Sequence, residues 1–297
     1  WPERPITLIV PFAPGGATDM VGRIMADQLG KTLGHTVIIE NKGGAAGAIG
    51  MADLARSKPD GYTFALITDS IPIQPLLNSS LPWDMSKFGA VAKIATSPEV
   101  LVVNPGVPVD SVKGFVEYAR SKPGELSYAA SSTGSVHHLA GEVFRQQTDI
   151  DMVHIPYKGG GQAVTDVVGA QLPLAILGPT PVLPHIRSGK LKAYAVTTTY
   201  RLKSLPDVPT MQEAGIPGYD ATQWFAAATV QGVDPQRIQK LNRLLGDIVT
   251  TPKFLEAVNA AGMIAGTGTP EDLQKFVARD NEKWAQVIKS TGLSVGR

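Results

Sequence analysis

Short apolar runs and amphipathic stretches alternate along the first two thirds of the chain. Residues 20–29 have the apolar spacing of an amphipathic helix, and a helix of small residues is expected to end near residue 57. Apolar runs of strand length occupy residues 6–10, 36–40 and 62–67. This strand–helix–strand order is typical of a parallel sheet with helices on both faces.

The same order starts again near residue 100, and then gives way to helices. Strands are expected at 101–103, 126–130, 152–157, 172–177 and 193–197, and helices at 111–121, 136–147 and 162–169. Three helical stretches follow at 234–249, 253–261 and 270–290. We expect these last helices to pack on a lobe that is already built. A chain of 297 residues is long enough for two lobes of ordinary domain size.

The loop after the first strand has the features of an anion site. Gly15 and Gly16 allow a tight turn and a close approach by a ligand, and Thr18 or Asp19 can cap the next helix. Free N–H groups at a helix N-terminus favour a phosphate, sulfate or carboxylate. The P-loop lysine and the dinucleotide fingerprint are missing, so a carboxylate fits best. The alternative is a tight turn that binds nothing.

A second loop at residues 131–135 repeats this chemistry with serine, threonine and glycine before a helix. The two loops fall in the two α/β units. In open parallel sheets, ligands bind beyond the carboxyl ends of the strands. Two such loops facing each other would form a cleft that closes on a small anion, as hinged binding proteins do.

Composition narrows the class of function. Hydrophobic residues make up 43% and charged residues 18%, as in globular proteins. A net charge of +1 and 6% aromatic residues give no reason to expect nucleic acid. The absence of cysteine removes disulfides and thiol catalysis. The chain begins at Trp1 without Met, which suggests either an N-terminus processed after secretion or a trimmed sequence.

Catalytic and metal-binding alternatives have weak support. His138 and Glu142 have the i, i+4 spacing of a metal pair, but no third ligand is evident. A dyad of Ser132 and His138 is conceivable, although no nucleophile-elbow motif surrounds the serine. We therefore expect no enzyme activity, no cofactor and no metal.

Several side chains have two interpretations each. Lys158 either faces an anionic ligand or is solvated. Trp224 is either a core or hinge residue or a wall of the cleft. Ser70 follows a strand of the first unit and is a plausible ligand contact. Its neighbour Asp69 would repel a carboxylate unless it meets an ammonium group or caps backbone N–H groups.

The chain resembles the substrate-binding receptors of the tripartite tricarboxylate transporters, the Bug or TctC family. The resemblance covers nearly the whole chain, and its motifs have the order and spacing of that family. They are VPFAPGGATD at 10–19, ENKGGAAG at 40–47, KPDGYT at 58–63, GSVHHLAGE at 134–142, HIPYKG at 154–159 and LPHIRSGK at 183–190.

This resemblance implies an α/β fold, the two-lobed periplasmic binding protein of type II. Such a clamshell has mostly parallel sheets with helices on both faces. Lobe 1 would comprise residues 1–100 plus 224–297 and lobe 2 residues 101–223, with the ligand cleft between them. The chain would cross between the lobes near 98–103 and 221–226.

The resemblance also implies the ligand class and the partners. A periplasmic monomer would capture a small carboxylate (a di- or tricarboxylate, an amino acid or an aromatic acid) and deliver it to membrane permease subunits. Backbone N–H groups, hydroxyls and bridging waters would hold the carboxylate. The residues expected at the ligand are Phe12, Pro14, Gly16, Ala17, Thr18, Asp19, Ser70, Ser131, Ser132, Thr133, Gly134, Ser135, His138, Tyr157, Gly178, Pro179 and Trp224.

One segment departs from the family pattern. Residues 176–181 are apolar with two prolines, where relatives often carry Phe and a polar or acidic residue. This difference favours an aromatic or aliphatic acid over a ligand with a charged distal group. Two alternatives to transport stay open: a sensor for a signalling partner, and a hydrolase that uses Ser132 and His138.

Overall fold

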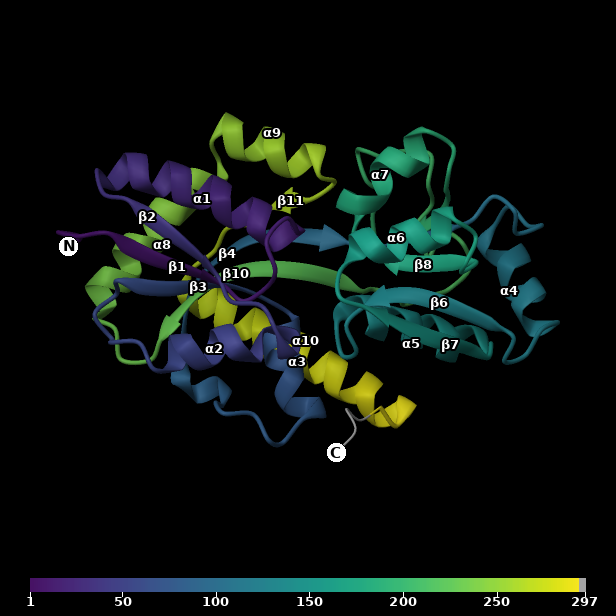
Figure 1. The fold of residues 1–297 in the computed structure, drawn as a ribbon, viewed down its shortest axis with the longest axis horizontal. Coiled ribbons are helices and arrows are strands. Elements are labelled where there is room, and N and C mark those ends of the chain that lie inside the picture. The colour runs from purple at the N-terminus through teal and green to yellow at the C-terminus, as the bar shows by residue number, and fades with distance from the viewer. Residues whose placement is uncertain (294–297) are drawn as a thin grey trace.

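The computed structural model describes residues 1–293 and has two lobes, each built around one β-sheet (Figure 1). The strands of the first sheet are β1 (Ile6–Val10), β2 (Val37–Asn41), β3 (Thr63–Thr68), β4 (Phe88–Pro98), β10 (Thr222–Val230) and β11 (Ile264–Ala265). The strands of the second sheet are β5 (Val100–Val103), β6 (Leu126–Ser131), β7 (Met152–Tyr157), β8 (Leu174–Leu177) and β9 (Lys192–Val196). The two-lobed α/β architecture expected from the sequence is confirmed.

Both sheets are mixed, where mostly parallel sheets were expected. The strand order is β11-β4-β10-β3-β1-β2 in the first sheet and β7-β6-β8-β5-β9 in the second. β1 pairs in parallel with β2 and β3, but β10 is antiparallel to β3 and β4. In the second sheet β6 is parallel to β7 and β8, but β5 is antiparallel to β8 and β9. The antiparallel strands β5 and β10 each enter a sheet directly after the chain has crossed from the other lobe, and the short β11 is antiparallel to β4.

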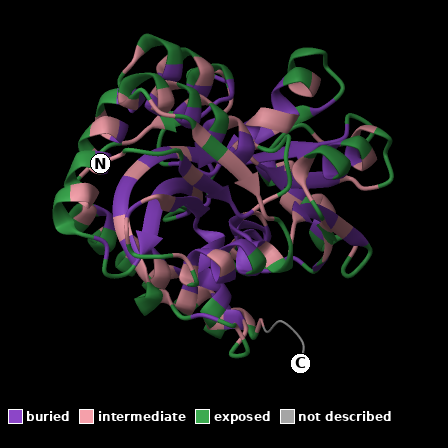
Figure 2. Ribbon diagram, turned by 60° about the vertical axis from the view of Figure 1, so that its left-hand side comes forward, coloured by how far each residue is buried: buried purple, intermediate pink, exposed green. Residues whose placement is uncertain are grey.

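Helices cover both faces of each sheet, and the strands between them are buried (Figure 2). The first lobe carries α1 (Ala17–Leu33), the 3-10 turn η1 (Ala45–Gly47), α2 (Ala48–Ala55), α3 (Ser70–Leu77), η2 (Met85–Lys87), α8 (Pro235–Val249), α9 (Pro252–Ala260) and α10 (Pro270–Thr291). The second lobe carries α4 (Val112–Arg120), α5 (Val136–Thr148), α6 (Gly160–Val168) and α7 (Pro179–Arg187). Within residues 1–293, no helix combines the length and apolar character that a membrane crossing requires.

The lobes touch on two sides of the gap between them. On one side, Trp284 and Ile288 of α10 and Leu77 of α3 belong to the same buried apolar cluster as Phe144 of α5. On the other side, the Thr180 hydroxyl of α7 donates to the carbonyl of Ala261, just after α9, at 3.1 Å. The loop between β1 and α1 and the loop between β6 and α5 both lie at this boundary between the lobes (Figure 1).

Candidate ligand-binding site

The loop between β1 and α1 offers free backbone donors at the side of the first lobe that faces the second (Figure 1). Gly15 has a φ of +87°, a left-handed conformation that favours glycine. α1 begins directly after Gly16, and no side chain caps it. Within the described chain, the N–H groups of Gly16, Ala17 and Thr18 donate to no protein acceptor. These groups lie at the positive end of the helix dipole and can bind an anion.

Asp19 holds this loop in shape. Its Oδ2 accepts from the Gly15 N–H at 2.9 Å and pairs with Arg23 Nε at 2.9 Å, and its Oδ1 accepts from Asn41 Nδ2 at 2.9 Å. Burial opposes ionisation of Asp19, but the bonds from Arg23, Gly15 and Asn41 outweigh it and lower its pKa. Both carboxylate oxygens of Asp19 thus have partners inside the protein, and Arg23 is paired with Asp19.

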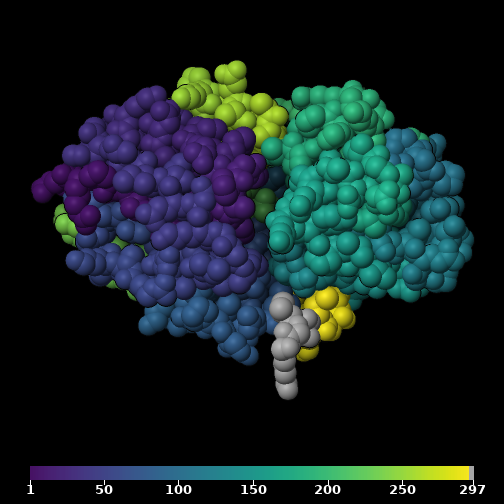
Figure 3. Space-filling model, in the orientation of Figure 1, coloured from purple at the N-terminus to yellow at the C-terminus, as the bar shows by residue number. Residues whose placement is uncertain are grey.

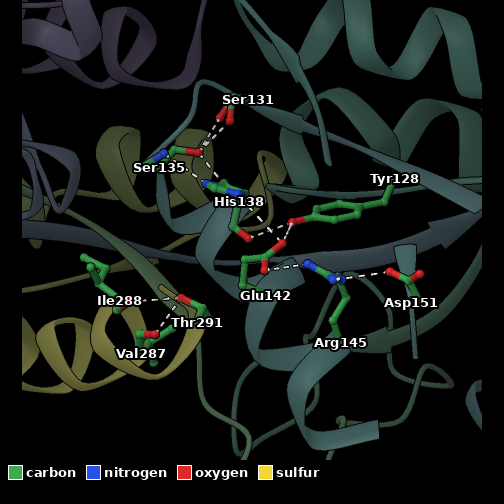
Figure 4. Close-up of polar contacts among 11 residues, drawn as sticks. Tyr128, Ser131, Ser135, His138, Glu142, Arg145, Asp151, Val287, Ile288 and Thr291 are labelled. Atoms are coloured by element: carbon green, nitrogen blue, oxygen red, sulfur yellow. Dashed lines mark hydrogen bonds and ion pairs between the residues drawn. The ribbon is translucent and has the colours of Figure 1, made fainter. Parts of the chain in front are cut away.

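The second loop, between β6 and α5, uses several of its own donors internally. The Ser132 N–H donates to the Tyr157 carbonyl at 2.9 Å, and the Ser135 N–H donates to the Ser132 carbonyl at 3.0 Å. The Ser135 hydroxyl caps α5 by accepting from the His138 N–H at 3.3 Å. Figure 4 shows Ser135 and His138 on this first turn of the helix.

The donors that remain on the second loop are mainly hydroxyls. Among residues 1–293, neither the Thr133 N–H nor the hydroxyls of Ser132 and Thr133 have a protein partner. No Lys or Arg occurs in residues 10–19 or 131–135. A carboxylate between the loops would therefore meet N–H and O–H groups and no side-chain cation from either loop.

His138 stabilises the second loop through a hydrogen bond to its backbone. Its Nδ1 accepts from the Gly134 N–H at 3.1 Å, and its ring stacks on His154 with the centroids 3.9 Å apart. Burial lowers the pKa of both imidazoles, for His154 to about 3. Nε2 of His138 lies 3.8 Å from Glu142, whose oxygens already accept from Tyr128 and Arg145 (Figure 4). A neutral His138 thus holds Gly134, and Ser132 has no hydrogen bond to it.

His137 makes a contact that sequence reasoning missed. Its Nδ1 lies 2.5 Å from Ser131 Oγ, and its Nε2 lies 3.0 Å from Oε2 of Glu99. Glu99 is fully buried at the crossing between β4 and β5. The side chain of His137 therefore connects the second loop to the crossing between the lobes. No motif in the sequence pairs Glu99 with His137, because the fold brings them together over 38 positions.

A second buried carboxylate lies near this contact. Asp69 directly follows β3, has no exposed surface, and neither carboxylate oxygen has a hydrogen-bond partner among the described residues. Burial, helped by the charges of Asp280 and Glu99, raises the pKa of Asp69 to about 8. Asp69 is therefore protonated at neutral pH, and it repels an anionic ligand less than an ionised carboxylate would.

An interlobe pocket adjoins the second loop (Figure 3). Its volume is about 440 Å³, and its lining includes Ser132 and Thr133 from the second lobe and Gln74 of α3 from the first. Gln74 is 5% exposed, and its Nε2 has no hydrogen-bond partner among residues 1–293. The pocket therefore joins two free hydroxyls to an unpaired amide donor.

The other residues expected at the ligand lie in varied surroundings. Pro14 is exposed, and Phe12 is half-buried with its carbonyl accepting from Asn41 Nδ2 at 3.3 Å. Ser70 is buried at the start of α3, beside Asp69. The Tyr157 hydroxyl donates to Asp166 at 2.5 Å.

Gly178 and Pro179 begin α7, and a side chain at Gly178 would contact Ser97, Glu99 and His137. Trp224 is fully buried and donates from Nε1 to Asp280 at 2.8 Å, which supports its interpretation as a core residue.

Two other possible sites lie outside this group. A depression of about 490 Å³ on the second lobe, between α4 and residues 214–217, contains none of the expected residues. Within residues 1–293, no three His, Cys, Asp or Glu side chains are grouped to hold a metal ion.

Comparison with known proteins identifies the family. Residues 21–293 match the model of the tripartite tricarboxylate transporter family receptor, TctC. The chain belongs to this family. Among its relatives, the protein BugT of Bordetella pertussis is 38% identical over 295 residues, which cover 98% of this chain and 90% of BugT.

Solved structures of TctC-type receptors have the same fold. Rpa4515 of R. palustris, solved with adipate, superposes with a TM-score of 0.93 at 33% identity and 99% coverage of both chains. MatC (Rpa3494) of Rhodopseudomonas palustris, solved with bound malate, superposes with a TM-score of 0.88 at 28% identity, over 97% of this chain and 100% of MatC. The resemblance to the TctC receptors inferred from the motifs is thus confirmed.

Proposed function

We propose that this TctC-family receptor captures a small dicarboxylate in the periplasm and delivers it to the permease subunits of a tripartite transporter. The observation that carries the proposal is the facing pair of loops, which offer unpaired N–H and O–H donors and no side-chain cation. Donors of this kind suit a carboxylate. The two solved relatives support a dicarboxylate, because adipate and malate each have two carboxylates.

In this proposal the two carboxylates occupy different surroundings. The first accepts from Gly16, Ala17 and Thr18 on one side and from Ser132 and Thr133 on the other. The second enters the adjoining pocket and meets the Gln74 amide, whose unpaired Nε2 would otherwise cost free energy in the closed molecule. The apolar character of residues 176–181 favours an aromatic or aliphatic acid over a ligand with a charged distal group, and adipate is such an aliphatic acid.

Calorimetric titration of the protein with adipate, malate and hexanoate tests the proposal. Hexanoate has the chain length of adipate and a single carboxylate, so it should bind about tenfold or more weakly than adipate or malate. Ser132→Ala should weaken binding of the dicarboxylate by roughly tenfold, because it removes a hydroxyl from an ionic hydrogen bond. Thr18→Ala should weaken binding less, because the Thr18 backbone N–H remains.

Lys158→Ala is the matched control for these two variants. Lys158 follows β7 and is exposed, so its removal should leave the affinity within about twofold. A larger loss for Lys158→Ala than for Thr18→Ala and Ser132→Ala combined would show that a salt bridge holds the carboxylate. Conversion of an added acid to a product, abolished by Ser132→Ala, would favour the hydrolase alternative instead.

A further inference from the structure

We propose that His137 sets the hydrogen-bond direction of the Ser131 hydroxyl, and that carboxylate binding is thereby linked to the uptake of one proton. The inference rests on the proposed function and adds a proton to it. It starts from the chain of contacts formed by Ser131 Oγ, the two nitrogens of His137, and Glu99, at 2.5 and 3.0 Å.

With Glu99 ionised, His137 has two protonation states to consider. In both of them Nε2 of His137, 3.0 Å from Oε2 of Glu99, carries the hydrogen that lies toward this carboxylate. In the neutral imidazole, Nδ1 then has no hydrogen and accepts from the Ser131 hydroxyl. In the imidazolium, Nδ1 donates to Ser131 Oγ, and the hydroxyl hydrogen can point either to Ser135 Oγ, 3.3 Å away, or to a ligand.

The direction of the Ser131 hydroxyl matters because Ser131 ends β6 at the second loop. With His137 protonated, Ser131 can add an O–H donor to those of Ser132 and Thr133. With His137 neutral, the Ser131 O–H donates to Nδ1 of His137, and Ser131 Oγ would offer the ligand only a lone pair. The protonated form should therefore bind a carboxylate more tightly, and the bound carboxylate should in turn favour the proton.

Acidic side chains near His137 favour its protonated form. Glu99 faces it from the β4–β5 crossing and Asp69 from the end of β3, while Asp280 of α10 faces Asp69. Burial disfavours the imidazolium, but the charge of Glu99 and the hydrogen bond to it outweigh burial and raise the pKa of His137 above its ordinary value. Asp69 adds negative charge only when it ionises, since its own pKa is about 8. Neighbouring His138 has the opposite shift and accepts from Gly134, so it does not compete for this role.

The same three residues have the composition of a hydrolytic Ser-His-acid relay, but the proton that the proposal places on His137 would prevent that use. A general base must be unprotonated to take the serine proton. An imidazolium held between Glu99 and Ser131 cannot do so. Since His137 donates to Ser131 in this state, it acts as a positioning residue for the hydroxyl.

Proton uptake can be counted directly by calorimetry. Adipate is titrated into the protein at about pH 8.5 in two buffers of different ionisation enthalpy, because the difference in observed heat gives the protons bound per ligand. Both carboxylates of adipate stay ionised there, so the proton must go to the protein. We expect an uptake approaching one proton and an affinity that weakens by up to about tenfold per pH unit above the pKa of free His137.

His137→Gln and Glu99→Gln test the assignment. His137→Gln should bind adipate with no proton uptake and no pH dependence. Glu99→Gln removes the charge that holds the proton, so the fall in affinity should begin at lower pH. Glu142→Gln is the matched control, because Glu142 is a buried glutamate on the same helix as His137 and contacts neither Ser131 nor Glu99. It should keep the proton uptake of the unmodified protein.

The outcomes separate this inference from the proposed function. Adipate and malate binding with no proton uptake, or uptake that persists in His137→Gln, would overturn the link to His137 while the receptor function stands. No binding of adipate, malate or hexanoate at any pH would instead overturn the proposed function. Loss of uptake in Glu142→Gln together with Glu99→Gln would assign the effect to general disturbance of α5.

Discussion

Single residues decide which donors each loop can offer. Asp19 and His138 were expected at the ligand, but the structure shows both engaged with their own loops. Asp19 accepts from Gly15, and His138 accepts from Gly134. Both contacts fix a glycine that lies in the left-handed region, at φ +87° and +78°. In the proposed site, an anion would therefore meet backbone and hydroxyl donors whose positions these two side chains set.

Asp69 provides a prediction at this scale. In the folded protein, burial raises the pKa of Asp69 to about 8, so the carboxyl stays protonated up to about that pH. In the unfolded chain an Asp carboxyl loses its proton near pH 4. The contribution of Asp69 to stability is thus complete below about pH 4 and is lost as the pH rises through about 8. Asp69→Asn has no proton to lose, so its free energy of unfolding should exceed that of the unmodified protein by a few kcal/mol near pH 8.

Urea unfolding near pH 5 and pH 8 measures this difference. The gain of Asp69→Asn should be larger at pH 8 than at pH 5. Asp19→Asn should have the opposite sign at pH 8, because hydrogen bonds lower the pKa of Asp19 and ionisation stabilises the fold. An equal effect of Asp69→Asn at both pH values would mean that Asp69 is ionised in the folded protein.

Among the elements, α5 supports the second loop of the candidate site, and its placement depends on Gly141. A side chain at Gly141 would overlap the ring of Tyr128 on β6, the strand that leads into the second loop. Gly141→Ala should therefore lower the free energy of unfolding by about 1–3 kcal/mol or more, through overpacking. It should also weaken adipate binding, because α5 and the loop must shift.

Gly161→Ala in α6 is the control for this prediction. Nothing lies within 4 Å of a side chain at Gly161, so alanine should stabilise that helix by up to about 1 kcal/mol. Thermal unfolding of both variants measures the contrast. A neutral Gly141→Ala would show that α5 does not approach β6 as closely as described.

The strand–loop–helix units that form the site could be predicted from sequence, because their apolar runs and glycine-rich or hydroxyl-rich loops are local signals. β10 was not predicted, since its centre is an Ala-rich run that resembles neither a typical strand nor a typical helix. α3 and α7 were not predicted either, because each contains a proline in its interior, which is atypical of a helix. The contact between Glu99 and His137 depends on how the chain crosses between the lobes at β4 and β5, and no local sequence motif indicates it.

At the scale of the whole molecule, the site lies between two sheets that are tied together on both sides. α10 and α3 share an apolar cluster with α5 on one side, and Thr180 of α7 bonds to Ala261 on the other. The division into residues 1–100 plus 224–297 and 101–223 stays a prediction, although the first crossing falls between β4 and β5 and the second between β9 and β10. The proposed carboxylate site would then be a property of the arrangement of the lobes, since each loop supplies only part of the donors.

A crystal structure of the protein with adipate tests the central claim most directly. One carboxylate should lie within hydrogen-bond distance of the backbone nitrogens of Gly16, Ala17 and Thr18 and of the hydroxyls of the second loop, with the other directed toward Gln74. Adipate bound outside the cleft, or held with its carboxylates against Lys or Arg side chains, would contradict the account.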